Sequence, residues 1–274
     1  MKYQKWHIGT ASEQDTALLK EAGYPSLLAT VLAARGITTA EAAAEALERE
    51  TSLTISPMLM RDMDKAVARI QKALANDETI AVFGDYDVDG ITSTVLLLDY
   101  LKNCGAKCLR YIPRRIEDGY GLSKDAIQGL RDKGVTLMIT VDCGITGNEE
   151  IDFAASIGMD VVVTDHHRCD GRIPDCCAVV CHTREDDKYP NGDICGAGIA
   201  WKLAEGLIGR EAAKRYIPQA GIATMTDVVP LLGENRAIVA VALDMINKGD
   251  CSPGIKALGR VVNDKSDAFV SRDL

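Results

Sequence analysis

The 274-residue sequence predicts an α/β fold: a mainly parallel, Rossmann-like sheet flanked by helices, with a helical N-terminal segment and a helical C-terminal part. Two observations predict it. From residue 79 onward, short apolar runs alternate with longer stretches of helical periodicity, as in repeated units of strand, helix and strand. Before residue 60 and after about residue 196, the helical periodicity continues without such runs.

We expect a helical segment over residues 1–60 and a second domain over residues 61–274, helical after about 196 and ending in a helix. The first segment is rich in alanine. A helix that starts at Ser26 should end at Gly36, and Thr38 or Thr39 can cap the next one. An amphipathic helix over residues 62–75 then leads into the sheet.

Five strands and six further helices are expected after residue 78. The strands are predicted at residues 79–83, 108–112, 135–141, 160–164 and 178–181. The helices are predicted at residues 90–103, 123–133, 148–157, 198–207, 210–225 and 234–247. Because the strands alternate with helices up to residue 164, the connections are those of a parallel sheet.

The composition is that of an ordinary globular protein, with 47% hydrophobic and 26% charged residues. No apolar run approaches the length of a membrane span, and the N-terminus lacks the apolar core of a signal peptide. We therefore expect a cytoplasmic protein without a membrane partner. A net charge of −9 argues against nonspecific coating of nucleic acid, but it does not exclude a nucleic-acid enzyme. Nine cysteines without a C-x-x-C pair indicate reduced thiols.

Three carboxylates at alternate positions follow the first predicted strand. Asp85, Asp87 and Asp89 have no Lys or Arg within residues 80–90, so their mutual repulsion predicts a bound divalent cation. The simpler interpretation is that they cap helices. Asp89 in particular can cap the helix that starts at Gly90 or support a ligand from behind.

Two other motifs share this spacing. An EF-hand calcium loop begins in the same way, but Leu96 stands where its final glutamate is required and a strand precedes the motif. In a haloacid-dehalogenase-like phosphatase, Asp87 would be the nucleophile. That chemistry gives no role to the paired histidines downstream, His166 and His167.

Further polar residues follow the later strands. Asp142 follows the third strand, and residues 165–167 (DHH) follow the fourth. Since the carboxyl ends of parallel strands share one edge of a sheet, we expect these side chains to meet the first cluster. Adjacent side chains on extended backbone point in opposite directions, so one histidine should bind metal and the other should face the substrate. Asp165 can orient one of the histidines.

Three weaker candidates lie elsewhere. Asp227 is an acid within an apolar segment and needs a partner such as a metal. Arg115 follows a strand, where it can bind a phosphate or lie in a surface loop. The amides of residues 195–198 (CGAG) open a helix, where they can hold an anion or allow close packing. His7 and His182 have no supporting pattern and are interpreted as structural or surface residues.

Four motifs in order resemble the DHH phosphoesterase superfamily: residues 84–90 (GDYDVDG), 141–145 (VDCGI), 164–167 (TDHH) and 226–231 (TDVVPL). Four further stretches narrow the resemblance to RecJ-type single-stranded-DNA exonucleases: residues 61–66 (RDMDKA), 115–122 (RIEDGYGL), 196–200 (GAGIA) and 253–258 (PGIKAL). It implies two Mn²⁺ or Mg²⁺ ions held by Asp85, Asp87, Asp142, His166 and Asp227. Asp142 would bridge the ions, and His167 would meet the scissile phosphate with Arg115 nearby.

The resemblance implies 5′-to-3′ exonuclease activity on single-stranded DNA in DNA repair and recombination, by two-metal hydrolysis with activated water. The binding partner would be single-stranded DNA or a short oligonucleotide. In a longer protein, a helicase or a single-strand-binding protein would be an additional partner. The family's second, substrate-binding domain has no counterpart here, so we expect the catalytic half of a longer protein.

Two alternatives remain open within this resemblance. One is a DHH hydrolase of short oligonucleotides, cyclic dinucleotides or pyrophosphate, and the other is a non-catalytic RecJ-like replication scaffold. The chain also departs from many relatives in two places. Residues 81–84 (AVFG) lack a histidine that precedes the first aspartate in some of them, and Cys181 and His182 stand where many have Asn-Pro.

Overall fold

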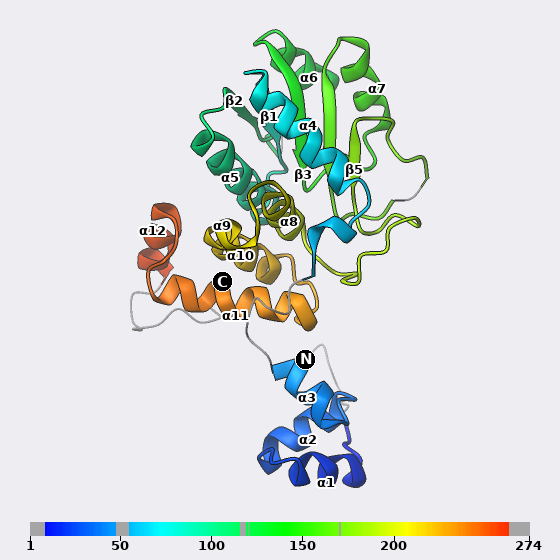
Figure 1. Cartoon of the computed structure of the whole chain (residues 1–274), viewed down its shortest axis with the longest axis vertical. Coiled ribbons are helices and arrows are strands. Elements are labelled where there is room, and N and C mark those ends of the chain that lie inside the picture. The colour runs from blue at the N-terminus through cyan, green and yellow to red at the C-terminus, as the bar shows by residue number, and fades with distance from the viewer. Residues whose placement is uncertain (1–8, 48–54, 116–118, 120, 170, 263–274) are drawn as a thin grey trace, which may run out of the picture. The chain divides into compact units, whose positions relative to one another are not determined.

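The structure is a computed structural model that describes residues 9–47, 55–115, 119, 121–169 and 171–262. The chain divides into two compact units, Met1–Arg49 and Glu50–Leu274, so residues 55–60 belong to the second unit. Figure 1 shows the elements of both units along the chain.

The first unit consists of three helices around a small apolar core. They are α1 (Glu13–Glu21), α2 (Ser26–Ala34) and α3 (Ala40–Leu47). Gly36 has a φ of 76°, and its amide donates to the carbonyl of Ala33. The helix α2 therefore ends just before Gly36, as the sequence predicts. The Thr39 hydroxyl accepts the amide of Ala42 at 3.1 Å, so Thr39 rather than Thr38 caps α3.

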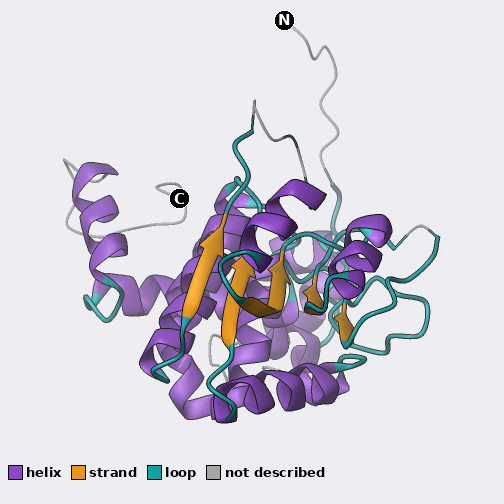
Figure 2. Cartoon of the chain, turned by 90° about the horizontal axis from the view of Figure 1, so that it is seen from above, coloured by secondary structure: helices purple, strands orange, loops and turns teal. Residues whose placement is uncertain are grey.

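The second unit contains one five-stranded sheet in which every neighbouring pair is parallel, as the sequence predicts (Figure 2). The strands are β1 (Thr79–Phe83), β2 (Cys108–Tyr111), β3 (Val135–Val141), β4 (Asp160–Thr164) and β5 (Ala178–Val180). Their order is β2-β1-β3-β4-β5, so β1 and β3 lie inside the sheet and β2 lies at an edge.

Helices cover both faces of the sheet (Figure 1). One face packs on α4 (Met63–Ala75), α5 (Val88–Asn103) and α8 (Gly196–Ile208), and the other packs on α6 (Lys124–Arg131) and α7 (Asn148–Ser156). Successive strand residues alternate between the two cores: Ile80 and Val82 enter the first, and Ala81 and Phe83 enter the second. Burial on both faces explains why the strands are continuous apolar runs.

The C-terminal part is helical, as predicted, but it is more divided than expected. Its elements are α9 (Arg210–Ala213), the 3₁₀ turn η3 (Lys214–Tyr216), α10 (Ile217–Thr226), α11 (Gly233–Asn247) and α12 (Pro253–Val262). A second 3₁₀ turn, η2 (Pro57–Leu59), precedes α4. The single helix expected over residues 210–225 is wrong. Pro218 lies in the first turn of α10 and has no amide hydrogen to continue a preceding helix.

All nine cysteines are free thiols, as expected for a protein without a disulfide framework. Cys143, Cys181 and Cys195 are buried. Among the described helices, none combines the length and apolar character that crossing a membrane requires.

Candidate metal centre

Seven acidic and imidazole side chains meet beyond the carboxyl ends of β1, β3 and β4. They form three overlapping groups, and in each group one ligand-capable atom per residue lies within 4.8 Å of the others. The groups are Asp85–Asp87–Asp142, Asp89–His166–Asp227 and Asp142–His166–His167. The strand-end segments predicted to converge do so, and Asp227 joins them from the end of α10.

Asp142 lies at the centre of this arrangement. It follows β3, is 1% exposed, and has a φ of 60°, an unfavourable backbone conformation for a residue with a side chain. Neither carboxylate oxygen has a hydrogen-bond partner among the described residues. His166 Nε2 lies 3.1 Å from Oδ1, but not in the orientation of a hydrogen bond. Burial raises the pKa of Asp142 to about 10, and the carboxylates of Asp89 and Asp87 add to the rise.

Two orphaned oxygens on one buried carboxylate require a positive partner, because burying an unpaired charge is strongly unfavourable. A pair of cations would meet this requirement, since Asp142 belongs to two of the three ligand groups. The surrounding donors are hard carboxylate oxygens with one or two imidazoles, a set that suits Mn²⁺ and Mg²⁺. The residues present therefore fit a pair of divalent ions.

Asp85 and Asp87 occupy the loop between β1 and α5. Asp85 is buried, its Oδ1 has no hydrogen-bond partner within the described chain, and burial raises its pKa. Asp87 is exposed, and its carboxylate accepts the amide of Gly90 at 2.9 Å, which makes Asp87 the N-cap of α5. A Cβ at Gly90 would stand 2.6 Å from the backbone N and O of Asp85, so only glycine fits there.

Of the two roles predicted for Asp89, capping of α5 is wrong, and support of a ligand agrees with its position near His166. Asp89 lies within α5 and does not cap it; its carboxylate accepts the amides of Gly196 at 2.7 Å and Ala197 at 2.6 Å, at the N-terminus of α8. The anion held by these amides is therefore a side chain of this chain and not a substrate phosphate. Burial raises the pKa of Asp89 to about 6, while the two amides act in the opposite direction. Asp89 Oδ2 also lies 3.7 Å from His166 Nε2.

The two histidines lie side by side, with ring centroids 4.5 Å apart, so the expectation that they point in opposite directions is wrong. The backbone turns after β4 instead of staying extended, because the Asp165 carboxylate accepts the amides of both His166 and His167. His166 faces carboxylates on both sides of its ring: Nε2 faces Asp142, and Nδ1 lies 3.7 Å from Asp227.

Asp165 orients His167, as the sequence suggested for one of the pair. Its Oδ1 lies 2.8 Å from His167 Nδ1, and its Oδ2 accepts the amide of Ile145 at 2.9 Å. Burial alone would raise the pKa of Asp165, but these hydrogen bonds lower it below its ordinary value. The hydrogen bond with Asp165 raises the pKa of His167.

Asp227 closes the centre from the C-terminal side. It follows the last residue of α10, is partly exposed, and has a pKa raised by burial. A hollow of about 140 Å³ lies between α5 and this helix end, and Asp87, Asp89 and Asp227 line it together with Val88 and Thr226. The hollow gives the carboxylates a route to solvent.

Arg115 lies beside the centre without entering any of the three groups. It is exposed, and its guanidinium carbon lies 5.2 Å from the ring centroid of Tyr86, the residue between Asp85 and Asp87. His182 belongs to none of the groups; its Nε2 lies 3.0 Å from the carbonyl oxygen of Gly192, and burial lowers its pKa. His7 lies outside the described residues.

Gly196 contacts the centre without being one of the predicted metal ligands. A Cβ on Gly196 would stand 2.8 Å from the Cβ and Oδ1 of Asp142, so the glycine lets the start of α8 pack against this aspartate. The sequence signal was the glycine pair at residues 196 and 198. The structure has both predicted explanations: the amides of Gly196 and Ala197 hold an anion, the Asp89 carboxylate, and Gly196 packs closely against Asp142.

Comparisons with known proteins give a consistent result. A family model described as "DHH family, N-terminal domain" matches residues 79–227. The single-stranded-DNA-specific exonuclease RecJ of Bacillus subtilis is 35% identical over 245 residues, which cover 89% of this chain and 31% of that protein. The chain thus spans about a third of the length of this curated relative.

Two solved structures are similar in fold. A crystal structure of exonuclease RecJ bound to manganese has a TM-score of 0.69 and 32% identity, over 76% of this chain and 54% of that one. A crystal structure of RecJ from Thermus thermophilus in complex with Mn²⁺ has a TM-score of 0.75 and 28% identity, over 92% of this chain and 36% of that one.

Proposed function

Because this chain belongs to the DHH family, we propose that it is a Mn²⁺- or Mg²⁺-dependent phosphodiesterase that removes nucleotides from the 5′ end of single-stranded DNA. The observation that carries the proposal is Asp142: its two buried oxygens lack hydrogen-bond partners among the described residues, and the residue belongs to two of the ligand groups. The relative and the two structures are single-stranded-DNA-specific or manganese-bound exonucleases, which favours DNA over cyclic dinucleotides or pyrophosphate.

We assign the metal ligands as the resemblance implied them: Asp85, Asp87, Asp142, His166 and Asp227. The proximity of Asp89 to His166 adds Asp89 as a residue that acts through His166 and α8. When bound, a pair of divalent ions polarises phosphoryl oxygens and lowers the pKa of water near the phosphate.

His167 and Arg115 are assigned to the substrate. Asp165 holds the Nδ1 side of the His167 ring, so the opposite side, with Nε2, is the one assigned to the scissile phosphate. The His167 side chain is 42% exposed, as a group that meets an incoming strand must be. Arg115 stacks on Tyr86 at the rim, where its fork of N–H donors can hold a neighbouring phosphate.

A catalytic role is favoured over a scaffold, because all the predicted ligands are present and close together. We further propose a role in DNA repair and recombination, as the resemblance implies, and the cytoplasm as the location. A helicase or a single-strand-binding protein remains a predicted partner of a longer polypeptide.

The experiment is a cleavage assay with Mn²⁺ on single-stranded DNA labelled at either end, beside a cyclic dinucleotide and pyrophosphate. Labelled mononucleotide should appear first from the 5′-labelled strand, and EDTA should abolish the reaction. Asp142→Ala should be inactive and should lose Mn²⁺ binding by calorimetry. Asp64→Asn, a change of an exposed acid on α4, is the matched control and should behave as wild type. Cleavage of pyrophosphate or dinucleotide without cleavage of DNA would refute the proposed substrate.

A further inference from the structure

The edge strand β2 has one side without a strand partner. Among the described residues it pairs with β1 alone. The Lys107 carbonyl accepts the amide of Ile80, and the Tyr111 carbonyl accepts the amide of Gly84. Because backbone groups alternate in direction along a strand, the N–H and C=O groups of the intervening residues Cys108 and Arg110 face away from β1. Such an edge is a template for one more strand.

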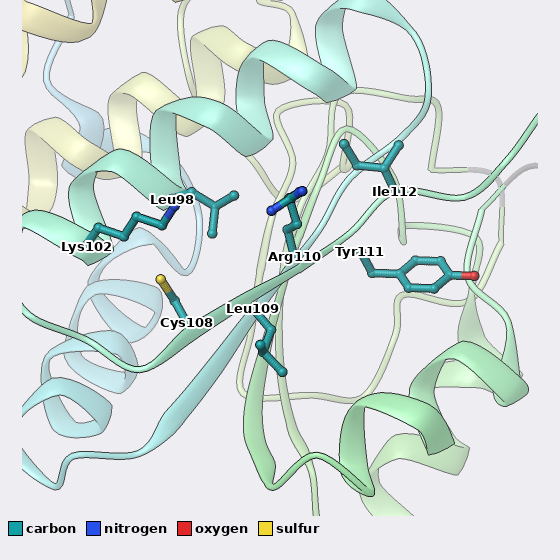
Figure 3. A pocket seen from close by; sticks show the side chains of 7 residues that line it. All are labelled: Leu98, Lys102, Cys108, Leu109, Arg110, Tyr111 and Ile112. Carbon is teal, nitrogen blue, oxygen red and sulfur yellow. The ribbon is translucent and has the colours of Figure 1, made fainter.

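Two hollows flank this edge, one on each face of the sheet. The first, of about 400 Å³, lies between β2 and α5 and is lined by Leu98, Lys102, Cys108, Arg110 and Ile112, among others. Figure 3 shows Cys108, Arg110 and Ile112 projecting toward the helix that carries Leu98 and Lys102, while Leu109 and Tyr111 project to the opposite side.

The second hollow, of about 240 Å³, lies between Tyr111 and α6. Its wall includes Ala126, Gly129 and Leu130, with Asp125 and Lys133 also lining it. A Cβ on Gly129 would have no other atom within 4 Å, so this part of the helix is open toward the hollow. The side chains of an added strand would alternate between the two hollows, because successive side chains of a strand point to opposite faces.

The two hollows differ in chemistry. Lys102 and Arg110 are exposed cations in a chain of net charge −9, and neither makes an ion pair with a described residue. By contrast, the neighbouring Lys107 is paired with Asp77. The first hollow is therefore cationic, whereas the second is mixed: Ala126 and Leu130 lie in its wall beside one acid and one base.

We propose that the free edge of β2 docks an extended peptide segment of a partner protein in which acidic and apolar residues alternate. Its backbone adds a strand to the sheet through Cys108 and Arg110. Its acidic side chains lie in the first hollow beside Lys102 and Arg110, and its apolar side chains lie against Leu130 in the second. Main-chain hydrogen bonds supply affinity in this mode of binding, and the alternate hollows supply specificity. The surface is separate from the metal centre, so the inference does not depend on the proposed activity.

Two other occupants fit the edge less well. A second copy of the chain, paired through the same strand, would bring cationic side chains of the two edges close together, and like charges across a strand pair are destabilising. A nucleic-acid strand would match Lys102 and Arg110, but its phosphates only accept hydrogen bonds. Phosphates beside the two cations would therefore offer no donor to the outward carbonyls of Cys108 and Arg110, whereas the N–H groups of a peptide strand would.

The test uses the full chain and a fluorescent synthetic peptide in which acidic and apolar residues alternate. Fluorescence anisotropy should show saturable binding, and hydrogen exchange should show new protection of the Cys108 and Arg110 amides. A peptide of the same composition with its acidic residues grouped together should bind at least about tenfold more weakly, because only one face of a strand meets the cations.

Three variants separate the parts of the proposal. Arg110→Glu reverses the charge, and Arg110→Pro removes the outward N–H, a substitution that edge strands tolerate on this side. Gly129→Leu fills the second hollow, and because leucine favours a helix more than glycine, lost binding cannot be ascribed to unfolding. Each should weaken binding about tenfold or more. Lys188→Glu makes the same change of charge at an exposed position after β5, the strand at the other edge, and should bind as wild type.

Specific outcomes would overturn the proposal. They are no binding of the alternating peptide, equal binding of the grouped peptide, or binding without amide protection at Cys108 and Arg110. A single-stranded oligonucleotide that protects these amides in EDTA, where the peptide does not, would assign the edge to nucleic acid. Dimerisation that Arg110→Pro abolishes would assign it to a second copy.

Discussion

Gly196 lies so close to Asp142 that a Cβ on the glycine would stand 2.8 Å from the Cβ and Oδ1 of the aspartate. Real Cβ atoms do not approach so closely, so any side chain at residue 196 must displace either Asp142 or the start of α8. The first turn of α8 is also fixed, because the amides of Gly196 and Ala197 hold Asp89. The packing of one glycine thus sets the position of the central carboxylate.

We predict that Gly196→Ala lowers the rate of DNA cleavage about a hundredfold, since a displacement of about 1 Å at reacting groups has effects of this size. Calorimetry should show weaker Mn²⁺ binding, and circular dichroism should show a folded protein. Gly192→Ala is the matched control, because a Cβ there meets no atom within 4 Å. Wild-type activity and metal affinity in Gly196→Ala would contradict the packing argument.

The stability of the metal-free protein should fall as the pH rises. Burial raises the pKa of Asp142 from 3.8 to about 10, so across this interval the folded state keeps a proton that the unfolded state has released. A state that binds more protons is favoured at low pH, so rising pH favours unfolding over this whole interval. The amide of Asp142→Asn does not titrate. The variant should therefore lose the part of the fall in unfolding free energy that Asp142 causes.

Urea unfolding in EDTA, from about pH 5 to about pH 9, measures this effect. At neutral pH the metal-free variant should be more stable than metal-free wild type by at least about 1 kcal/mol. Added Mn²⁺ should reverse the order, because only wild type has the carboxylate that the ions require. Parallel pH profiles for the two proteins would show that burial of Asp142 does not disfavour its charge.

Asp165→Asn should reduce cleavage by misplacing His167. Oδ1 accepts the amides of His166 and His167 and contacts His167 Nδ1, and Oδ2 accepts the amide of Ile145; asparagine has a single oxygen, so its NH2 group must face a donor on one of these two sides. We expect a loss of about tenfold to a hundredfold in kcat. In a double-mutant cycle with His167→Ala, the two losses in kcat should not add, because both substitutions remove the same function, the correctly placed His167 ring. Additive losses would give Asp165 a role independent of this histidine.

Arg115→Ala should raise KM for single-stranded DNA and leave kcat nearly unchanged, because the guanidinium is exposed and stacks on Tyr86 at the rim of the centre. We expect a change of about tenfold, as for a charge-assisted hydrogen bond to phosphate. Tyr86→Leu removes the ring on which Arg115 stacks and should give part of the same effect. Arg172→Ala, at an exposed arginine paired with Asp152, is the control. A fall in kcat with unchanged KM would place Arg115 in the chemical step.

The sheet and the meeting of its strand-end residues could be predicted because both follow from local rules. Strands buried on two faces are short apolar runs, and parallel strands present their carboxyl ends at one edge. Asp85, Asp142 and His166 could thus be grouped although they lie far apart in sequence. The same rules gave Asp89 no unique role, since its partners lie 107 and 108 residues away at the start of another helix.

The errors have local causes. The histidine pair was predicted from extended backbone, but the Asp165 side chain holds both following amides and turns the chain. Periodicity alone merged α9 and α10, because it does not register the amide hydrogen that Pro218 lacks. The histidine pair is positioned by hydrogen bonds between a side chain and the nearby backbone, and the helix break is set by a missing backbone donor. A pattern of apolar positions carries no information about either.

The ligand-capable residues extend along the chain from Asp85 to Asp227, and the last of them follows α10. During synthesis the earlier carboxylates would therefore repel one another, without metal ions to offset their charge, until residue 227 has left the ribosome. Nascent chains stalled before residue 227 should bind Mn²⁺ poorly, and longer ones should bind it abruptly better. Metal binding would then report that the segment up to Asp227 has been synthesised and has folded.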